Sequence, residues 1–302
     1  MKSFKQTAKL LKQMKKIIIS ILVLIPLLII GAFWFAGSAL STPMPVTVGN
    51  CPSDLTCENI EFPSESGANI KGWFLKGEEG KGALVLMHGL RSNRLSLVDR
   101  IRFLKKAGYS ILAFDFQGSG ESVGEKLTFG YLESRDATAS LKFIRQKLPN
   151  EKVGVVGISM GGAAFLLQKE SPKVDAVILE MVYPTIQKAI ENRLNLWLFN
   201  GANNLAFMMT KQLPIRIGVS AEELRPLDHI KSVTCPTFII AGENDHHTTL
   251  AESRQLFEAA NQPKDLWVVP QAEHGDLLKN APKDYEQKVL EFFETTLRGE
   301  KK

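Results

Sequence analysis

The chain has 302 residues, of which 44% are hydrophobic and 23% charged, and its formal net charge is +5. This composition is typical of a globular protein with a sizeable core, in one large domain or two small ones. Six lysines and no acidic residue lie within residues 1–16. The rest of the chain therefore has 31 of the 37 basic residues and all 32 acidic ones. A body this close to neutral argues against nucleic-acid binding, which requires a basic face.

An uncharged apolar run, IIISILVLIPLLIIGAFWFA, occupies residues 17–36. A helix of this length spans about 30 Å, the hydrocarbon thickness of a bilayer. The basic arm of residues 1–16 is expected to stay in the cytoplasm, and Trp34 lies at the far end, where interfacial aromatics collect. We expect an uncleaved transmembrane anchor over residues 17–37. The alternative is a secretory signal, cleaved near the small residues 37–39.

Two observations bear on the compartment of the remaining chain. Cys51 and Cys57 are six residues apart, and either they close a small disulfide in an oxidising compartment or they are two unrelated thiols. No Asn-x-Ser/Thr sequon occurs, which favours a bacterial protein. We expect a single-pass protein of a bacterial inner membrane, with the body on the periplasmic side. Cys235 begins an apolar run and is expected to be a buried thiol.

Short apolar runs alternate with helical patterns after a linker at residues 38–59. The runs are mostly continuous, as expected for strands buried on both faces of a parallel sheet: Ile70–Leu75, Ala83–Met87, Ser110–Phe114, Lys152–Val156, Ala176–Leu179, Thr237–Ile240 and Leu266–Val269. Helical patterns lie at about 93–107, 131–147, 161–170, 249–260 and 284–297. This alternation predicts an α/β domain with a mostly parallel central sheet and crossover helices.

The interval 182–228 breaks the alternation. It has no convincing strand, but it has several helical and strongly apolar segments, with Trp197, Phe199 and Phe207 among their residues. We interpret it as a helical insertion between two strands. It is either a subdomain with its own core or a lid whose inner face contacts a substrate, and the two interpretations are compatible.

A serine stands between two glycines in Gly157-Ile-Ser159-Met-Gly161, after the strand-like VGVV and before the helical GGAAFLLQK. A serine hydroxyl is a poor nucleophile until a base removes its proton. In a G-x-S-x-G turn the serine occupies a tight strand-to-helix corner, and the glycines relieve crowding there. The following helix points free N–H groups at the reacting centre. The pattern indicates Ser159 as a nucleophile.

An acid and a histidine follow Ser159 in the order that such a site requires. Asp245 follows one predicted strand and His274 the next, so both lie at carboxyl ends of strands, where open α/β sheets form their sites. His274 would accept the serine proton and Asp245 would fix its tautomer. Glu243 is the competing acid. The residue types at 245–247 could bind a metal, but no second group of ligands lies at a suitable spacing. We therefore expect neither a metal nor a cofactor.

The loop after the strand at 83–87 begins with His88-Gly89. In a hydrolase this loop supplies one oxyanion-hole donor, here the backbone N–H of Leu90, and the residue after the nucleophile, Met160, supplies the other. His88 itself is expected to be a structural hydrogen-bonding residue.

These segments together resemble the α/β-hydrolase superfamily over about residues 60–298. The resemblance is carried by His88-Gly89, Asp115-Phe-Gln-Gly118-Ser-Gly120-Glu-Ser122, Gly157-Ile-Ser159-Met-Gly161, Gly242-Glu-Asn-Asp245 and Glu273-His274-Gly275. It is nearest to membrane-anchored or exported serine hydrolases of esterase, lipase or serine-aminopeptidase type. Gln117 stands where those proteins often have arginine. The resemblance implies the α/β-hydrolase fold and acyl transfer to water.

The expected activity is cleavage of an ester or related acyl bond through an acyl-enzyme, on a small-molecule or lipid-like acyl substrate. Two alternatives stay open. A peptidase needs a group that holds a peptide terminus, for which Glu180 and Glu191 are candidates. A binding or scaffold protein could retain the fold without turnover, although such relatives often lack a member of the triad. The oligomeric state is not predicted.

Overall fold

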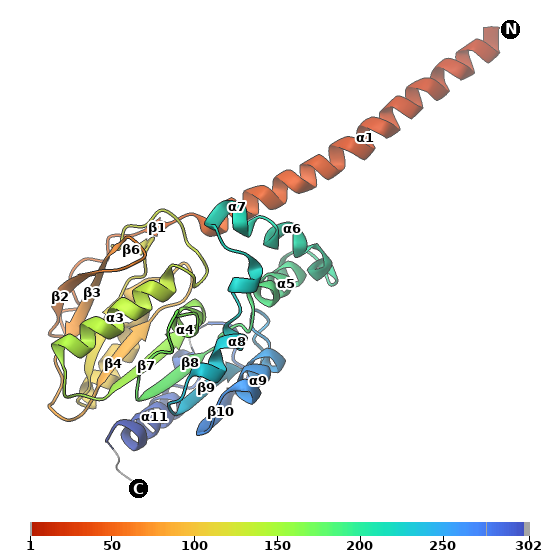
Figure 1. Ribbon diagram of the computed structural model, residues 1–302. Coiled ribbons are helices and arrows are strands. Elements are labelled where there is room, and N and C mark those ends of the chain that lie inside the picture. Colours follow the sequence, from red (N-terminus) through yellow and green to blue (C-terminus); the bar gives the residue numbers. More distant parts are fainter. Residues whose placement is uncertain (1, 276, 299–302) are drawn as a thin grey trace.

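The apolar runs form the central sheet of the protein, seen in Figure 1 with its flanking helices. The computed structural model describes residues 2–275 and 277–298. The sheet order is β10-β9-β8-β7-β4-β5-β3-β2, and every neighbouring pair is parallel except β3 with β5 and β2 with β3. The strands are β2 (Glu58–Pro63), β3 (Asn69–Leu75), β4 (Ala83–Met87), β5 (Ser110–Phe114), β7 (Val153–Ile158), β8 (Ala176–Glu180), β9 (Thr237–Gly242) and β10 (Lys264–Val269).

Helices cover both faces of this sheet, which explains why its central strands are apolar without alternation. Successive strand residues point to opposite faces, so Val85 packs into one core and Leu84 into the other. The first core includes side chains from α3 (Glu133–Lys147), α4 (Met160–Leu166) and α9 (Leu250–Ala259). The second includes side chains from α2 (Val98–Lys106), α10 (Leu277–Asn280) and α11 (Pro282–Phe293). The predicted α/β class is confirmed.

The insertion between β8 and β9 is helical. It consists mainly of α5 (Ile186–Trp197), α6 (Phe207–Thr210), α7 (Leu213–Ile217) and α8 (Pro226–His229), joined by short 3-10 turns. Thr185 caps α5, because its hydroxyl accepts a hydrogen bond from the Lys188 N–H at 3.1 Å. The insertion also has a small core of its own around Leu194 and Met209. It is therefore a helical subdomain, and one of its faces lines the pocket described below.

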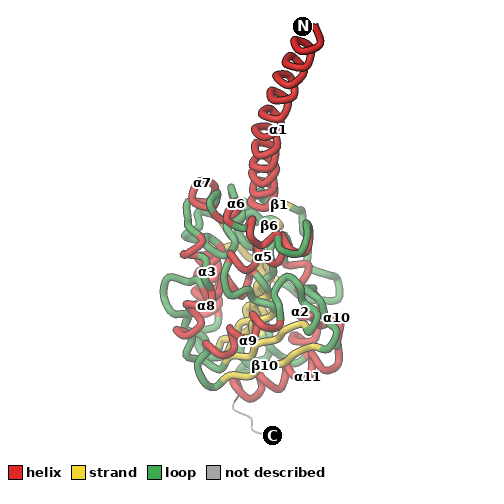
Figure 2. The backbone as a smooth tube through the Cα atoms, turned by 90° about the vertical axis from the view of Figure 1, so that its right-hand side faces the viewer, coloured by secondary structure: helices red, strands yellow, loops and turns green. Residues whose placement is uncertain are grey.

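One long helix, α1 (Lys2–Ser41), extends away from the body in both views (Figures 1 and 2). An 18-residue window within its segment Lys9–Ser41 has a mean hydropathy of 2.9, and the segment is long and apolar enough to cross a membrane. The helix continues four residues beyond the predicted end at Gly37, because its last turns pack against α6 and α7. At its end the Ser41 hydroxyl donates to the Gly37 carbonyl at 2.9 Å.

The expected linker is shorter than its predicted range 38–59 and is tied to the body. Its strand β1 (Met44–Pro45) pairs with β6 (Ser119–Gly120), and a disulfide joins Cys51 to Cys57. The strand β2 already begins at Glu58. The strand pair and the disulfide give structure to the segment between α1 and β2. It is therefore not the unstructured linker of 22 residues that the range 38–59 suggests.

Candidate active site

The order of strands creates the crevice in which the candidate residues lie. After β4 the chain continues to β5 on one side, and β7 later pairs with the other side of β4. Loops that leave such a switch point diverge and open a crevice at the carboxyl ends of the strands. The last residue of β4, Met87, pairs with Gly157. The loop containing Leu90 and the turn containing Ser159 therefore lie side by side.

Ser159 occupies a strained corner between β7 and α4. Its φ of 49° and ψ of −114° lie in a region that costs a residue with a side chain about 1–3 kcal/mol. The corner is held because the Ser159 N–H donates to the Glu180 carbonyl at 2.7 Å and its carbonyl accepts from the Ala163 N–H at 3.0 Å. A Cβ on Gly157 would lie 2.6 Å from Cα of Gly162. The glycine here permits close approach of strand and helix, while Ser159 itself carries the unusual φ.

The structure brings Ser159, His274 and Asp245 into one hydrogen-bonded chain. The Ser159 Oγ lies 3.3 Å from His274 Nε2, and His274 Nδ1 lies 2.8 Å from Asp245 Oδ2. The other carboxylate oxygen of Asp245 accepts the backbone N–H groups of His247 and Thr248, each at 2.8 Å. The Asp245 side chain is fully buried, whereas that of His274 is 17% exposed. With Nδ1–H directed at Asp245, the Nε2 lone pair faces the serine hydroxyl.

The competing residues have other roles. Glu243 is exposed and accepts the Gln271 N–H at 2.8 Å. His246 is exposed, and the described residues contain no group of three or more His, Cys, Asp or Glu side chains that could hold a metal. His247 stacks on His274 with ring centroids 5.0 Å apart. Burial and the nearby positive charge of Arg193 lower the pKa of His247 to about 4, so it is neutral at neutral pH.

The two expected oxyanion-hole residues, Leu90 and Met160, lie in the pocket wall together with Ser159. Within residues 2–275 and 277–298, neither the Leu90 N–H nor the Met160 N–H has an acceptor, and both residues line the pocket that contains Ser159. Met160 is the first residue of α4, where an N–H has no partner within the helix. His88 is buried: its Nδ1 contacts the Gly89 carbonyl at 2.8 Å and its Nε2 accepts the Phe116 N–H at 3.0 Å. Burial lowers its pKa, so neutral His88 links the two loops.

A buried ion-pair cluster holds the loop after Leu90. The Arg94 N–H donates to Asp115 Oδ1 at 2.7 Å, and the Arg94 guanidinium pairs with the carboxylates of Asp115 and Glu121. A Cβ on Gly120 would overlap the Asp115 carboxylate, so the glycine-rich loop is shaped around this charge. Arg94 was not identified from the sequence, because the helical pattern at 93–107 also contains Arg100, Arg102 and other charged residues.

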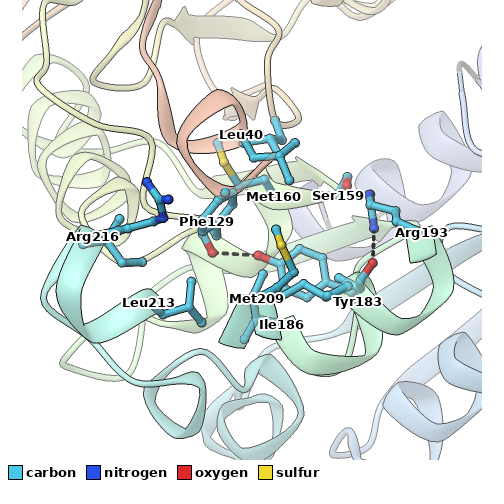
Figure 3. A pocket seen from close by; sticks show the side chains of 15 residues that line it. Leu40, Phe129, Ser159, Met160, Tyr183, Ile186, Arg193, Met209, Leu213 and Arg216 are labelled. Atoms are coloured by element: carbon cyan, nitrogen blue, oxygen red, sulfur yellow. Dashed lines mark hydrogen bonds between the residues drawn. The ribbon is translucent and has the colours of Figure 1, made fainter. Parts of the chain in front are cut away.

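An apolar pocket opens beside Ser159, and Figure 3 shows the side chains that line it. It encloses about 700 Å³ of empty space, part of it open to solvent. The Tyr183 hydroxyl in its wall donates to the Phe129 carbonyl at 2.7 Å. The lining is made by Gly37, Leu40, Leu90, Phe129, Ser159, Met160, Tyr183, Ile186, Ala189, Ile190, Arg193, Met209, Leu213, Arg216 and Ile217.

The two acids considered as peptide-terminus ligands lie elsewhere. Glu180 is fully buried, pairs with Arg100 at 2.8 Å and accepts a hydrogen bond from the Tyr285 hydroxyl. Glu191 pairs with Lys188 at 2.7 Å. Neither acid lines the pocket, and the described charged residues that do are Arg193 and Arg216.

Comparison with known proteins matches this architecture. A solved esterase of Pyrococcus furiosus superimposes with a TM-score of 0.70, is 23% identical, and the alignment covers 85% of this chain and 98% of that one. The chain has the α/β-hydrolase fold. The sequence model of the family described as serine aminopeptidase, S33, matches residues 78–216 of this chain. That range includes Leu90 and Ser159 and ends before Asp245 and His274.

Two bacterial relatives are similar over most of their length. The protein YqkD of Bacillus subtilis is 23% identical over 237 residues, which is 77% of this chain and 78% of the relative. The protein YfhR of Escherichia coli is 22% identical over 284 residues, which is 91% of this chain and 90% of the relative. The second similarity extends across nearly the whole chain, so it is not confined to the serine motif.

Proposed function

We propose that this α/β-hydrolase cleaves carboxylic esters through an acyl-enzyme formed on Ser159. The single observation that carries the proposal is the chain of contacts from Ser159 Oγ to His274 and on to Asp245, at the end of an apolar pocket. A spacing of 3.3 Å between a nucleophile and its base is usual before substrate binds. Among the described lining residues, no other side chain is a nucleophile with a base in reach.

The steps follow from these positions. His274 Nε2 takes the proton as Ser159 Oγ attacks the ester carbonyl carbon, and Asp245 stabilises the imidazolium that results. The negative oxygen of the tetrahedral intermediate accepts the N–H groups of Leu90 and Met160. The intermediate collapses when His274 gives its proton to the departing alkoxide. Water then attacks the acyl-enzyme by the same route, with His274 again as base, and releases the acid and free Ser159.

The pocket favours an acyl ester over a peptide. Its wall is almost entirely apolar and suits an acyl chain or a similar group. Its charged members, Arg193 and Arg216, would repel the amino terminus that an aminopeptidase must bind. The described residues of the pocket lining therefore include no acid of the kind that the peptidase alternative requires, although the S33 family match keeps aminoacyl substrates worth assaying.

We propose the following division of the chain and its location. Residues 1–16 form a cytoplasmic basic arm and 17–37 the membrane anchor, while 60–298 form the hydrolase domain outside the cytoplasm, with 182–228 as its lid. The hydropathy of α1 and the Cys51–Cys57 disulfide support this arrangement. Carbonate extraction of membranes tests the anchor, because a soluble product shortened by about forty residues would indicate a cleaved signal instead.

Labelling with a fluorophosphonate probe tests the nucleophile. We expect the wild-type chain to label and Ser159→Ala to remain unlabelled while it keeps its melting temperature, because the serine hydroxyl is the group that reacts. Equal labelling of both proteins would remove Ser159 from the mechanism. A panel of p-nitrophenyl esters and aminoacyl-anilides then assigns the substrate class. A folded chain that turns over none of them would favour a binding protein.

A further inference from the structure

The end of the long helix is part of the pocket wall. Gly37 and Leu40, from the last two turns of α1, line the same pocket as Ser159. Figure 3 shows Leu40 near Met160 on the wall opposite Ile186 and Met209 of the lid. Figure 1 shows the same junction from outside, where α6 and α7 lie against the base of α1. The helix that would cross the membrane therefore also lines the proposed acyl site.

The lid holds this part of α1 by several directed contacts. Arg216 of α7 donates through Nη1 to Ser38 Oγ at 2.6 Å and through Nη2 to the Trp34 carbonyl. Its guanidinium also lies over the Trp34 ring, 4.1 Å from the centroid. Phe33, the residue before Trp34, is buried in the small core of the lid with Met209. The position of α1 is therefore set by the folded domain and is not that of a loose tether.

The body holds the end of α1 from the other side. Arg91, the neighbour of Leu90, donates to the Ala39 carbonyl at 2.8 Å, and the Leu127 N–H donates to the Ser41 carbonyl at 2.9 Å. A Cβ on Gly37 would lie 2.6 Å from Gln212 Oε1 and 2.9 Å from Arg216 Nε. A small residue at position 37 is thus explained by packing.

Exposed apolar side chains surround this junction. The lid exposes large apolar residues on α5, α6, α7 and the loop after α5, with exposed fractions of 47–72%: Leu196, Trp197, Leu198, Phe199, Phe207 and Ile215. On α1 itself, Trp34 is 44% exposed and Phe35 75%. Apolar surface of this extent next to a membrane-spanning helix fits the acyl layer of a bilayer.

We propose that residues 33–41 of α1 form the membrane-side wall of the acyl pocket, and that the substrate is a long-chain acyl ester resident in the same membrane. The proposal rests on the hydrolase function proposed above. The acyl chain enters between the lid and α1, lies against Leu40, and presents its carbonyl carbon to Ser159. Leu40 is then a specificity-determining residue, because it limits the depth available to the chain.

The test uses the full-length chain in phosphatidylcholine vesicles, with p-nitrophenyl acetate, octanoate and palmitate as substrates. Leu40→Trp fills the pocket, and we expect the ratio of kcat/KM for palmitate over acetate to fall by at least about tenfold, since even one methylene that cannot be accommodated costs this much. Leu40→Ala should raise the palmitate-to-octanoate ratio. The matched control is Leu28→Trp, on the same helix at a side chain that is 71% exposed and outside the pocket, and it should leave both ratios unchanged.

The outcomes separate this inference from the proposed function. Fluorophosphonate labelling of each variant establishes that its site is folded. If wild type hydrolyses esters but Leu40→Trp keeps the wild-type ratio, or loses all three substrates equally, α1 is not part of the acyl site. If wild type hydrolyses no ester of any length, the proposed function fails first and this inference fails with it.

Discussion

Replacing Gly161 by alanine tests whether the contact between α4 and the loop after β4 sets the proposed oxyanion site. A Cβ atom at this position would lie 2.4 Å from the Met87 carbonyl oxygen and 2.6 Å from that of His88. Both are backbone atoms, so no side-chain rotation relieves the clash. To reach even 3.0 Å, below which Cβ contacts are essentially never seen, one segment must retreat by about 0.6 Å.

A retreat of this size exceeds the range of donor distances over which an oxyanion hole stabilises its charge. Oxyanion-hole donors act at about 2.7–3.1 Å from the charged oxygen, a window of about 0.4 Å. The Leu90 N–H would leave that window, because Leu90 follows the displaced carbonyls of Met87 and His88 by only three and two residues. Loss of one donor lowers kcat by about 10²–10³, equivalent to about 3–4 kcal/mol of transition-state stabilisation. We expect a further destabilisation of the fold by about 1–3 kcal/mol from overpacking.

The assay compares kcat for p-nitrophenyl butyrate and the melting temperature of three proteins: wild type, Gly161→Ala and Gly275→Ala. Gly275 is the matched control, since it adjoins His274 and a Cβ there would meet nothing within 4 Å. We expect the control to behave like wild type and Gly161→Ala to lose most of its turnover while it remains folded. Wild-type kcat in Gly161→Ala would refute the reasoning, because the loop would then accept the methyl group without moving Leu90.

Two further substitutions test the site and its support. Asp245→Asn leaves the shape of the side chain but allows the wrong His274 tautomer, so kcat should fall by about 10⁴, and a loss below about tenfold would remove Asp245 from its proposed role. Asp136 accepts hydrogen bonds from Ser64, Ser66 and the Gln117 N–H, yet burial raises its pKa to about 7. Between pH 3.8, the pKa of Asp136 in the unfolded chain, and about pH 7, its pKa in the folded chain, Asp136 is ionised in the unfolded chain but protonated in the folded one. The free energy of unfolding should therefore fall as the pH rises through this range, by at most about 4 kcal/mol. Asp136→Asn should flatten this dependence in denaturant titrations, and an unchanged slope would contradict the assignment.

The sequence predicted the buried strands well because burial on both faces produces continuous apolar runs. It missed β2, which lies at the antiparallel edge of the sheet and buries only Ile60 and Phe62 among its residues. That short alternation lies across the boundary at 59/60 between the expected linker and the expected hydrolase domain, and it is too brief to indicate a strand. The helix α1 continues beyond residue 37, where the expected anchor ends, and the contacts of its last turns come from α6 and α7, far away in the sequence.

The residues of the candidate site also differ in how well they can be identified from the sequence. Ser159, Asp245 and His274 were identifiable because each follows a strand, and strand ends converge by topology alone. Residues that act through long-range packing gave no comparable signal. Arg94 looks like any helix-surface arginine, and Leu40 belongs to a run whose hydropathy indicates only a membrane. Their place beside the site depends on how separate elements meet in three dimensions.

The contacts around Ala39 bear on whether the N-terminal helix is retained. The small residues 37–39 suggest a cleavage site when only the sequence is considered. In the folded chain Gly37 makes room for Gln212 and Arg216, the Ser38 hydroxyl accepts from Arg216, and the Ala39 carbonyl accepts from Arg91. Cleavage after Ala39 would remove Gly37 from the pocket lining, together with the Ala39 carbonyl that contacts Arg91, the residue next to Leu90. Packing accounts for the glycine at position 37 without cleavage, and we favour an anchor that stays attached because the proposed acyl site includes it.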